Sequence, residues 1–261
     1  MSAPSSPRQR IAAHAALELK LLRRSGESLL VTFGVPLGLL VFFGTTDVLP
    51  TDGDPLIFLV PGVIAIAILS TGFVAQAIQT GFERKYGVLK RLGASPLTRA
   101  QFITGKALSV AVVVIVQVTI LLGTALALGW RVSIATPGQL ASLGDSPAFI
   151  RPGLLAVAVL LGAFAFTALG LALAGAVRAE LVLAGSNAVY LAMMALSDLV
   201  FDLPAAADPF IVWTPSGALG IALRGALDGA TTGPVGLALL VLSGWGLLAV
   251  AFATRTFRWE P

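Results

Sequence analysis

The sequence predicts an all-α membrane protein in which six helices cross the bilayer and form a single domain over residues 1–261. Three observations support this fold class. The chain is 57% hydrophobic and only 11% charged, with a mean hydropathy of +0.93, whereas soluble domains carry about 25% charged residues. Six apolar runs are long enough to span, since a helix needs about 20 residues to cross a bilayer. The basic residues gather between alternate runs, as expected for a chain that crosses the membrane repeatedly.

Residues 8–24 precede the first span and predict an interfacial helix that lies on the membrane surface. Ile11, Ala15 and Leu22 share one arc of the helical wheel, and basic side chains lie opposite. The alternative is a cytosolic extension of the first spanning helix. His14 lies in this segment and is expected to be a solvated side chain without a functional role.

The six spans follow in order, and three local features modify this part of the chain. Pro36 is expected to kink the first span, which lipid-embedded helices tolerate when neighbours satisfy the freed carbonyl. Lys106 lies close enough to the start of the third span for its ammonium to reach the interface. Residues 202–232 precede the last span and predict an extracellular or re-entrant segment, in which residues 215–227 form a re-entrant or interfacial helix. The predicted spans are residues 26–44, 56–82, 102–130, 152–177, 181–201 and 234–254.

The distribution of charge orients these spans. Six spans place both termini on one side, together with residues 83–98. Only three of the 17 Lys and Arg residues lie on the other side, namely Arg131, Arg151 and Arg224. By the positive-inside rule, the termini and residues 83–98 are cytoplasmic. The net charge of +4 therefore reflects topology anchors, and we expect no nucleic-acid partner.

Residues 83–98 form a basic segment between the second and third spans. Its first ten residues predict a short amphipathic helix, which Ser95 and Pro96 end before the third span begins. A helix of this kind can dock into a groove on a partner protein. The alternative is that it rests on anionic lipid. One face carries Tyr86, Val88, Leu89 and Leu92, interrupted by Lys85, and the other carries Glu83, Arg84, Lys90 and Arg91.

Polar residues recur on single faces of the second, third and fifth spans. One interpretation is a translocation path lined with amides and soft apolar groups. The alternative is hydrogen bonding between helices, which contributes about 0.6 kcal/mol for each bond on average. The candidate path residues are Gln76, Gln79, Gln117, Thr124, Asn187, Tyr190 and Met194.

The sequence contains no motif for catalysis or for nucleotide binding. No phosphate-binding loop of the G-x-x-x-x-G-K-[ST] type is present, and no cluster with metal-ligand spacing occurs. We therefore expect no catalytic residue, metal site or cofactor on this chain. The span centres also lack ionisable residues, which an ion-coupled carrier usually keeps at mid-membrane. The energy for transport is then expected to come from another protein.

Three segments resemble the permease subunits of type-2 ABC exporters, a family of bacterial drug, polysaccharide and lipid exporters. Residues 60–62 read Val-Pro-Gly at the start of the second span. Residues 83–92, followed by Ser95-Pro96-Leu97, are similar to the family element E-x-x-x-G-x-L-[KR]-x-L…P-[LV]. With the six-span layout, the resemblance covers nearly the whole chain and points to multidrug-efflux members. The third segment combines Leu203-Pro204, Thr214-Pro215 and Leu223-Arg224.

This resemblance implies a cytoplasmic coupling helix that fits a cleft in a separate ATPase subunit, which binds ATP and Mg²⁺. Two permeases, either two copies of this chain or this chain and a paralogue, would join two ATPases in a bacterial cell membrane. The chain itself would be a permease and not an enzyme. The residues implied in ATPase coupling are Glu83, Arg84, Tyr86, Gly87, Val88, Leu89, Lys90, Arg91, Leu92 and Pro96.

The expected substrate is hydrophobic or amphipathic, such as a drug-like molecule or a lipid, moved out of the cell by alternating access. The lack of a charged interior site and the short extracellular loops favour this class. Export of a polysaccharide or lipid-linked polymer is one alternative. An ion-coupled secondary carrier is another, from a different class of protein.

Overall fold

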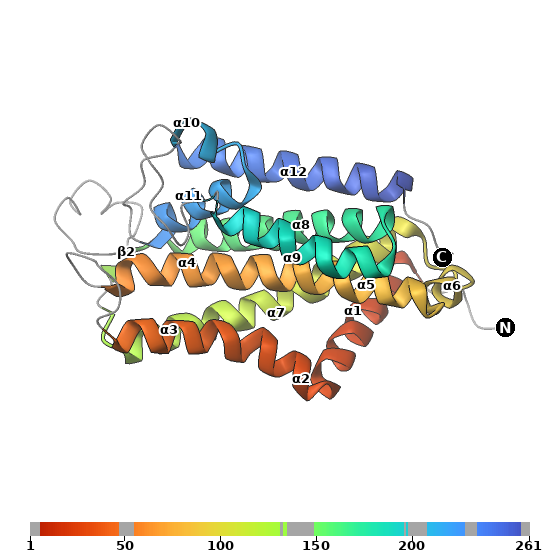
Figure 1. Ribbon diagram of the computed structural model, residues 1–261, viewed down its shortest axis with the longest axis horizontal. Helices are drawn as coiled ribbons and strands as arrows, with labels where there is room; N and C mark the ends of the chain where they lie inside the picture. Colours follow the sequence, from red (N-terminus) through yellow and green to blue (C-terminus); the bar gives the residue numbers. More distant parts are fainter. Residues whose placement is uncertain are drawn as a thin grey trace.

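Helices dominate the structure because a segment inside the bilayer has to pair its own backbone groups. The computed structural model describes residues 6–46, 55–130, 133–134, 149–195, 197, 208–227 and 234–256. Within these residues, five helical stretches are long and apolar enough to cross a membrane, and they confirm five of the predicted spans to within a few residues. They run along the long axis of the molecule (Figure 1). Their bounds are Gly26–Thr45, Pro55–Lys85, Arg99–Ala127, Pro152–Ala176 and Val235–Arg255.

The predicted fifth span corresponds to α9 (Ala179–Ala195), an apolar helix of 17 residues. The end of that prediction, residues 198–201, lies outside the described part of the chain. A total of six spans therefore stays a prediction. A short turn around Arg178 joins α9 to α8 (Pro152–Ala176), as the sequence indicates.

The predicted N-terminal helix is α1 (Pro7–Arg24), which begins at a capping box. Ser6 Oγ accepts a hydrogen bond from the Gln9 backbone N–H, and the Gln9 side chain accepts one from the Ser6 backbone. The helix lies at one end of the bundle, at an angle to the spans (Figure 1). It packs against α7 (Arg99–Ala127), the third span.

Gly105 explains why α1 and α7 come close together. A Cβ atom added at Gly105 would lie 2.6 Å from His14 Cδ2, so the glycine leaves room for the imidazole. The His14 ring stacks on Phe102 with ring centroids 5.0 Å apart. The prediction that His14 is solvated is therefore wrong, since the residue is 5% exposed.

The first two spans each contain a π-helical segment, a wider turn that often marks a functional site. In the first span this segment ends just before Pro36, which has no backbone N–H to donate. The kink predicted at Pro36 stays a prediction, and the structure shows a wider helical turn just before it. The first span consists of α2 (Gly26–Leu29), η1 (Leu30–Gly34) and α3 (Val35–Thr45), and the second of α4 (Pro55–Leu69), η2 (Ser70–Ala75) and α5 (Gln76–Lys85).

The prediction of one helix over residues 83–92 is wrong, because α5 continues to Lys85 and a separate helix, α6 (Val88–Gly93), begins after Tyr86 and Gly87 and ends before Ser95. The chain enters it through Gly87, whose φ of +71° lies in the left-handed region that favours glycine. Leu89 is 1% exposed and belongs to an apolar cluster with Phe102 and Leu171, which holds α6 against the bundle. The start of α1, α6 and the end of α12 (Val235–Thr256) lie at the same end of the molecule (Figure 1).

The central helix of the bundle is α8, which packs against α7, α12 and the second span. Two glycines set its distance from the second span. A Cβ atom at Gly170 would lie 2.6 Å from Phe73 O, and one at Gly72 would lie 3.0 Å from Phe166 Cβ. Small residues at such positions let helix backbones approach closely in lipid.

The predicted re-entrant segment, residues 202–232, is described only in part. It contains α10 (Asp208–Ile211) and α11 (Pro215–Leu227), and α11 is almost wholly buried against α4, α8 and α12.

The all-α prediction needs one small correction. The two-residue strands β1 (Ser133–Ile134) and β2 (Phe149–Ile150) pair in parallel. The Arg151 N–H next to β2 donates to Ala226 O at 2.7 Å, which ties this pair to the end of α11.

Candidate functional site

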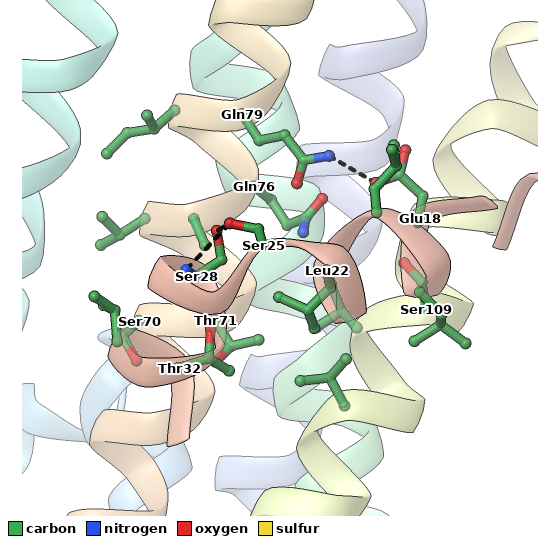
Figure 2. A pocket seen from close by; sticks show the side chains of 18 of the residues that line it. Glu18, Leu22, Ser25, Ser28, Thr32, Ser70, Thr71, Gln76, Gln79 and Ser109 are labelled. Atoms are coloured by element: carbon green, nitrogen blue, oxygen red, sulfur yellow. Dashed lines mark hydrogen bonds between the residues drawn. The ribbon is translucent and has the colours of Figure 1, made fainter. Parts of the chain in front are cut away.

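A cavity of about 580 Å³ lies between α1, the first two spans, α7 and α9. It adjoins the bend between α1 and α2 (Figure 2). Cavities that bind drug-sized ligands have volumes of about 300–1,000 Å³. Leucine and valine side chains form its apolar walls, and hydroxyl groups come from both π-helical segments, α2 and α7. The serine and threonine residues of the lining are Ser25, which caps α2, and Ser28, Thr32, Ser70, Thr71 and Ser109.

The structure gathers four of the seven predicted path residues at this cavity. Those that line it are Gln76, Gln79, Asn187 and Tyr190. The other three, Gln117, Thr124 and Met194, are not part of its lining. Thr124 Oγ1 donates to Ile120 O in its own helix, so this bond is not one of the bonds between helices that the alternative interpretation expects. The transport role of the lining residues stays a prediction.

Gln117 joins the two π-helical segments to each other. Its Nε2 atom donates to Thr32 O in η1 at 2.6 Å, and its Oε1 atom accepts from Thr71 Oγ1 in η2 at 3.1 Å. Both partners line the cavity, whereas Gln117 is 2% exposed and lies behind them. This amide therefore positions two walls of the cavity without contacting its interior.

A buried cluster of charged groups borders the cavity where α1 meets α5 and α7. Lys106 is completely buried, and its Nζ atom lies 3.0 Å from both Glu18 Oε1 and Glu83 Oε1. Gln79 Nε2 donates to Glu18 Oε2 at 2.7 Å (Figure 2) and to Glu83 Oε1 at 2.8 Å. The prediction that Lys106 extends to the interface is wrong, because carboxylates on two other helices pair with its ammonium inside the protein.

His14 extends this cluster along α1. Its Nε2 atom lies 3.7 Å from Glu18 Oε1. Burial lowers the pKa of His14 below its ordinary value of 6.5, because the charged ring would lose its solvation. Glu18 opposes this shift and Lys106 reinforces it. The ring therefore favours its neutral form more strongly than an exposed histidine does.

Sequence reasoning missed this cluster because its members come from three helices that are distant in the chain. One signal was present in α1. Glu18 lies three residues after Ala15 and four before Leu22, so it falls on the arc predicted to be apolar. A carboxylate on a buried face has to find a cation, and the structure supplies Lys106.

The predicted coupling residues divide between the bundle interior and the surface. Glu83 and Arg84 end the second span and make their contacts inside the bundle. Arg84 donates to Gly175 O at 3.2 Å and to Val177 O, which are carbonyls at the end of α8. A cation at the C-terminus of a helix also interacts favourably with the helix dipole. Arg84 thus joins α5 to the end of α8.

The next residue ties α5 to α9. Lys85 Nζ lies 2.5 Å from Glu180 Oε1 in an exposed ion pair, which lowers the pKa of the Glu180 carboxyl. Together, Arg84 and Lys85 connect the end of the second span to both helices beside the turn at Arg178.

The surface that α6 offers to a partner is narrower than the sequence predicts. Leu89 faces the bundle and is buried, so a direct contact between Leu89 and another protein would require α6 to leave its place. Gly87 and Leu92 are partly buried. The exposed members of the predicted set are Tyr86, Val88, Lys90, Arg91 and Pro96.

Comparison with known proteins agrees with this architecture. A family model described as "ABC-2 type transporter" matches residues 10–216 of the chain, which run from α1 to the first residues of α11. The match covers well over half of the sequence and includes the cavity, the charged cluster and α6. No curated protein matches the chain.

Proposed function

The chain belongs to the ABC-2 type transporter family, the permease component of type-2 ABC transporters, and on this basis we propose that it is the membrane-spanning subunit of an ATP-driven exporter. Its substrate is a hydrophobic or amphipathic molecule, drug-like or lipid, that leaves the cell by alternating access. A separate ATPase subunit binds ATP and Mg²⁺, and two such subunits join two permeases. The end of the bundle that carries α6 faces the cytoplasm of a bacterial cell.

The observation that carries this proposal is the cavity between α1, the first two spans, α7 and α9. Its volume of about 580 Å³ suits a drug-sized molecule or part of a lipid. Its walls combine Leu22, Val110 and Val113 with hydroxyl and amide groups, as an amphipathic substrate requires. A long polymer is too large to be enclosed in a cavity of this size.

A route from a partner ATPase to this cavity runs through α5 and α6. The exposed residues of α6 can contact the partner, while Leu89 holds α6 to the bundle. The same chain segment continues back through Gly87 into α5, where Gln76 and Gln79 line the cavity. A displacement of α6 would therefore act on the cavity wall directly through α5.

A second candidate function is an ion-coupled carrier, which the buried cluster of His14, Glu18, Glu83 and Lys106 favours. Ionisable groups inside membrane proteins often belong to ion pathways. Here Glu83 and Lys106 lie toward the ends of their spans, His14 and Glu18 belong to α1, which precedes the first span, and Lys106 pairs with both carboxylates. This geometry suits a structural junction between three helices better than a site at mid-membrane.

Transport in proteoliposomes tests the proposal. The permease would be purified together with the ABC ATPase that accompanies it and reconstituted with ATP on the ATPase side. Rhodamine 6G, an amphipathic dye, and a fluorescent phospholipid are expected to move only with hydrolysable ATP, whereas a fluorescent dextran should not move. Val31→Trp should slow the dye because Val31 lines the cavity, and Val35→Trp is the matched control, as Val35 is similarly exposed but lies outside the cavity.

Other outcomes would contradict this function. Dye movement driven by a proton gradient, without ATPase or nucleotide, would support the ion-coupled carrier instead. Movement of the dextran with no movement of either amphiphile would support polymer export.

A further inference from the structure

The face of α1 that points away from the bundle is both apolar and basic. Leu17 and Leu21 are 45% and 49% exposed. Lys20 and Arg24 are also exposed, and each follows one of these leucines by three residues, which places all four side chains on one face of the helix. Ala15, in contrast, is buried, because the opposite face packs against α7. The arc that the sequence predicts to be apolar therefore contacts protein, and a different arc faces outward.

The cations of this outward face border a surface hollow near the end of α1. No carboxylate among the described residues, Glu27 in α2 included, forms a salt bridge with these cations. The only carboxylate of α1, that of Glu18, is buried against Lys106 instead. The hollow thus offers positive charge beside apolar carbon, which suits an anion attached to a hydrocarbon chain. Its described lining consists of Ala16, Leu19, Lys20, Arg23 and Arg24.

This basic end of α1 lies at the boundary of the first span. Arg24 is the last residue of α1, and Ser25 alone separates it from the span that begins at Gly26. One turn into the span, Leu30 and Val31 are 71% and 57% exposed, as expected for side chains that contact lipid. Because α1 leaves the span at an angle (Figure 1), its last turns stay close to the bilayer surface. The cations are therefore at the level of the lipid head groups.

We propose that this face of α1 binds an anionic phospholipid of the adjacent leaflet. The lipid phosphate pairs with Lys20 and Arg24, and an acyl chain packs along Leu17 and Leu21. Arginine suits this contact because its planar guanidinium can donate two hydrogen bonds to one phosphate. Arg23, on the same hollow, adds to the positive field. The inference goes beyond the proposed exporter and does not depend on it, since it involves neither the transported substrate nor the ATPase.

Lipid enrichment in nanodiscs tests this without ATPase or nucleotide. The chain has no cysteine, so Ala13→Cys, at an exposed position two turns before Lys20, accepts a single donor dye. Phosphatidylcholine nanodiscs would contain a trace of acyl-labelled acceptor lipid, either phosphatidylglycerol or phosphatidylcholine, and energy transfer measures its enrichment near α1. We expect phosphatidylglycerol to be enriched about tenfold over phosphatidylcholine, because each cation at a bilayer surface contributes a factor of about five.

Two double variants of equal charge identify the site. Lys20→Gln with Arg24→Gln keeps long polar side chains and removes both cations, so the enrichment should fall from about tenfold to about twofold. Arg8→Gln with Arg91→Gln is the matched control, because it removes the same charge from exposed positions at the start of α1 and in α6. The control should keep the enrichment. Both double variants should keep the wild-type unfolding midpoint, since all four side chains are exposed.

Equal enrichment of the two lipids, or an unchanged preference in Lys20→Gln with Arg24→Gln, would overturn the proposal and leave α1 without lipid selectivity. An equal loss in the control variant would overturn it too, because the preference would then follow net charge alone. Failure of ATP-driven transport with the enrichment intact would instead contradict the exporter and leave the lipid site standing.

Discussion

Lys106 Nζ lies 3.0 Å from Glu18 Oε1, and this contact joins the N-terminal helix to the third span inside the protein. Both side chains are buried, and Glu83 on the second span completes the junction at 3.0 Å. Three helices that differ in direction thus meet at one ammonium. Because an unpaired buried charge is costly, the position of α1 on the bundle depends on this lysine.

Removal of the lysine should therefore destabilise the protein. Lys106→Met leaves two carboxylates close together without a cation, and we expect the free energy of unfolding to fall by about 3–5 kcal/mol. Thermal unfolding in detergent measures the change. Lys20→Met is the control, because Lys20 is exposed on α1. Adding Glu18→Gln and Glu83→Gln to Lys106→Met should recover part of the lost stability, because it removes the unpaired negative charges. An unchanged unfolding midpoint in Lys106→Met would show that the cluster contributes little to stability.

Stability should also depend on pH through His14. Its pKa is lowered in the folded protein, so the unfolded chain binds the proton more readily. The contribution of neutral His14 is full above the unfolded pKa of about 6.5 and decreases as the pH falls toward and through the folded pKa. Unfolding midpoints measured between about pH 7.5 and about pH 5.5 should fall more steeply in the wild type than in His14→Asn. Parallel curves for the two proteins would contradict this assignment.

The glycine contact between α8 and the second span gives a steric prediction. In Gly170→Ala the new Cβ atom would lie 2.6 Å from Phe73 O, a backbone atom that cannot move aside cheaply. We expect a loss of about 1–3 kcal/mol in unfolding free energy, as for other overpacked cores. Gly123→Ala is the matched control, since no atom lies within 4 Å of the added Cβ. It should be neutral or slightly stabilising because alanine favours helix.

Variants in α6 should distinguish a loss of ATPase binding from a loss of folding stability. Val88→Asp together with Arg91→Glu alters the exposed face and should abolish co-purification of the ATPase with an unchanged unfolding midpoint. Leu89→Asp places a charge in an apolar cluster and should lower the midpoint itself, since Leu89 is 1% exposed. If the protein with both Val88→Asp and Arg91→Glu still co-purifies with the ATPase, the coupling surface lies elsewhere on the protein.

Gln117 should matter more than Thr124, although both are polar residues of the third span. Gln117→Leu removes the bonds to Thr32 and Thr71 that join the two π-helical segments, which should cost about 1–2 kcal/mol of stability. Thr124→Val loses only a bond to Ile120 within α7 and should be nearly neutral. Equal effects of the two changes would argue against a bridging role for Gln117.

Local chemistry accounts for the features of the fold that the sequence predicts well. The spans follow from apolar runs of sufficient length, because each helix pairs its own backbone groups whatever its neighbours are. The sequence predicts the start of α6 too early, at residue 83, although Gly87 is a local signal for the break, since glycine tolerates the left-handed backbone there. The family follows from the residues around 83–97 and from the layout of the spans.

The candidate site is predictable only in part, for a physical reason. Gln76 and Gln79 could be placed on one helix face from their spacing, but the cavity beside them depends on which helix packs opposite. The burial of Leu89 likewise depends on Phe102 and Leu171, which come from other helices.

Periodicity and composition by themselves therefore determined that this chain crosses a membrane repeatedly, and where most of its spans begin and end. Only the tertiary structure decided the state of its charged groups. Lys106 is fully buried because Glu18 and Glu83 reach it from two other helices, and His14 is buried because Gly105 leaves space for its ring. Contacts between distant segments set solvation and pairing, and no pattern within a single helix contains that information.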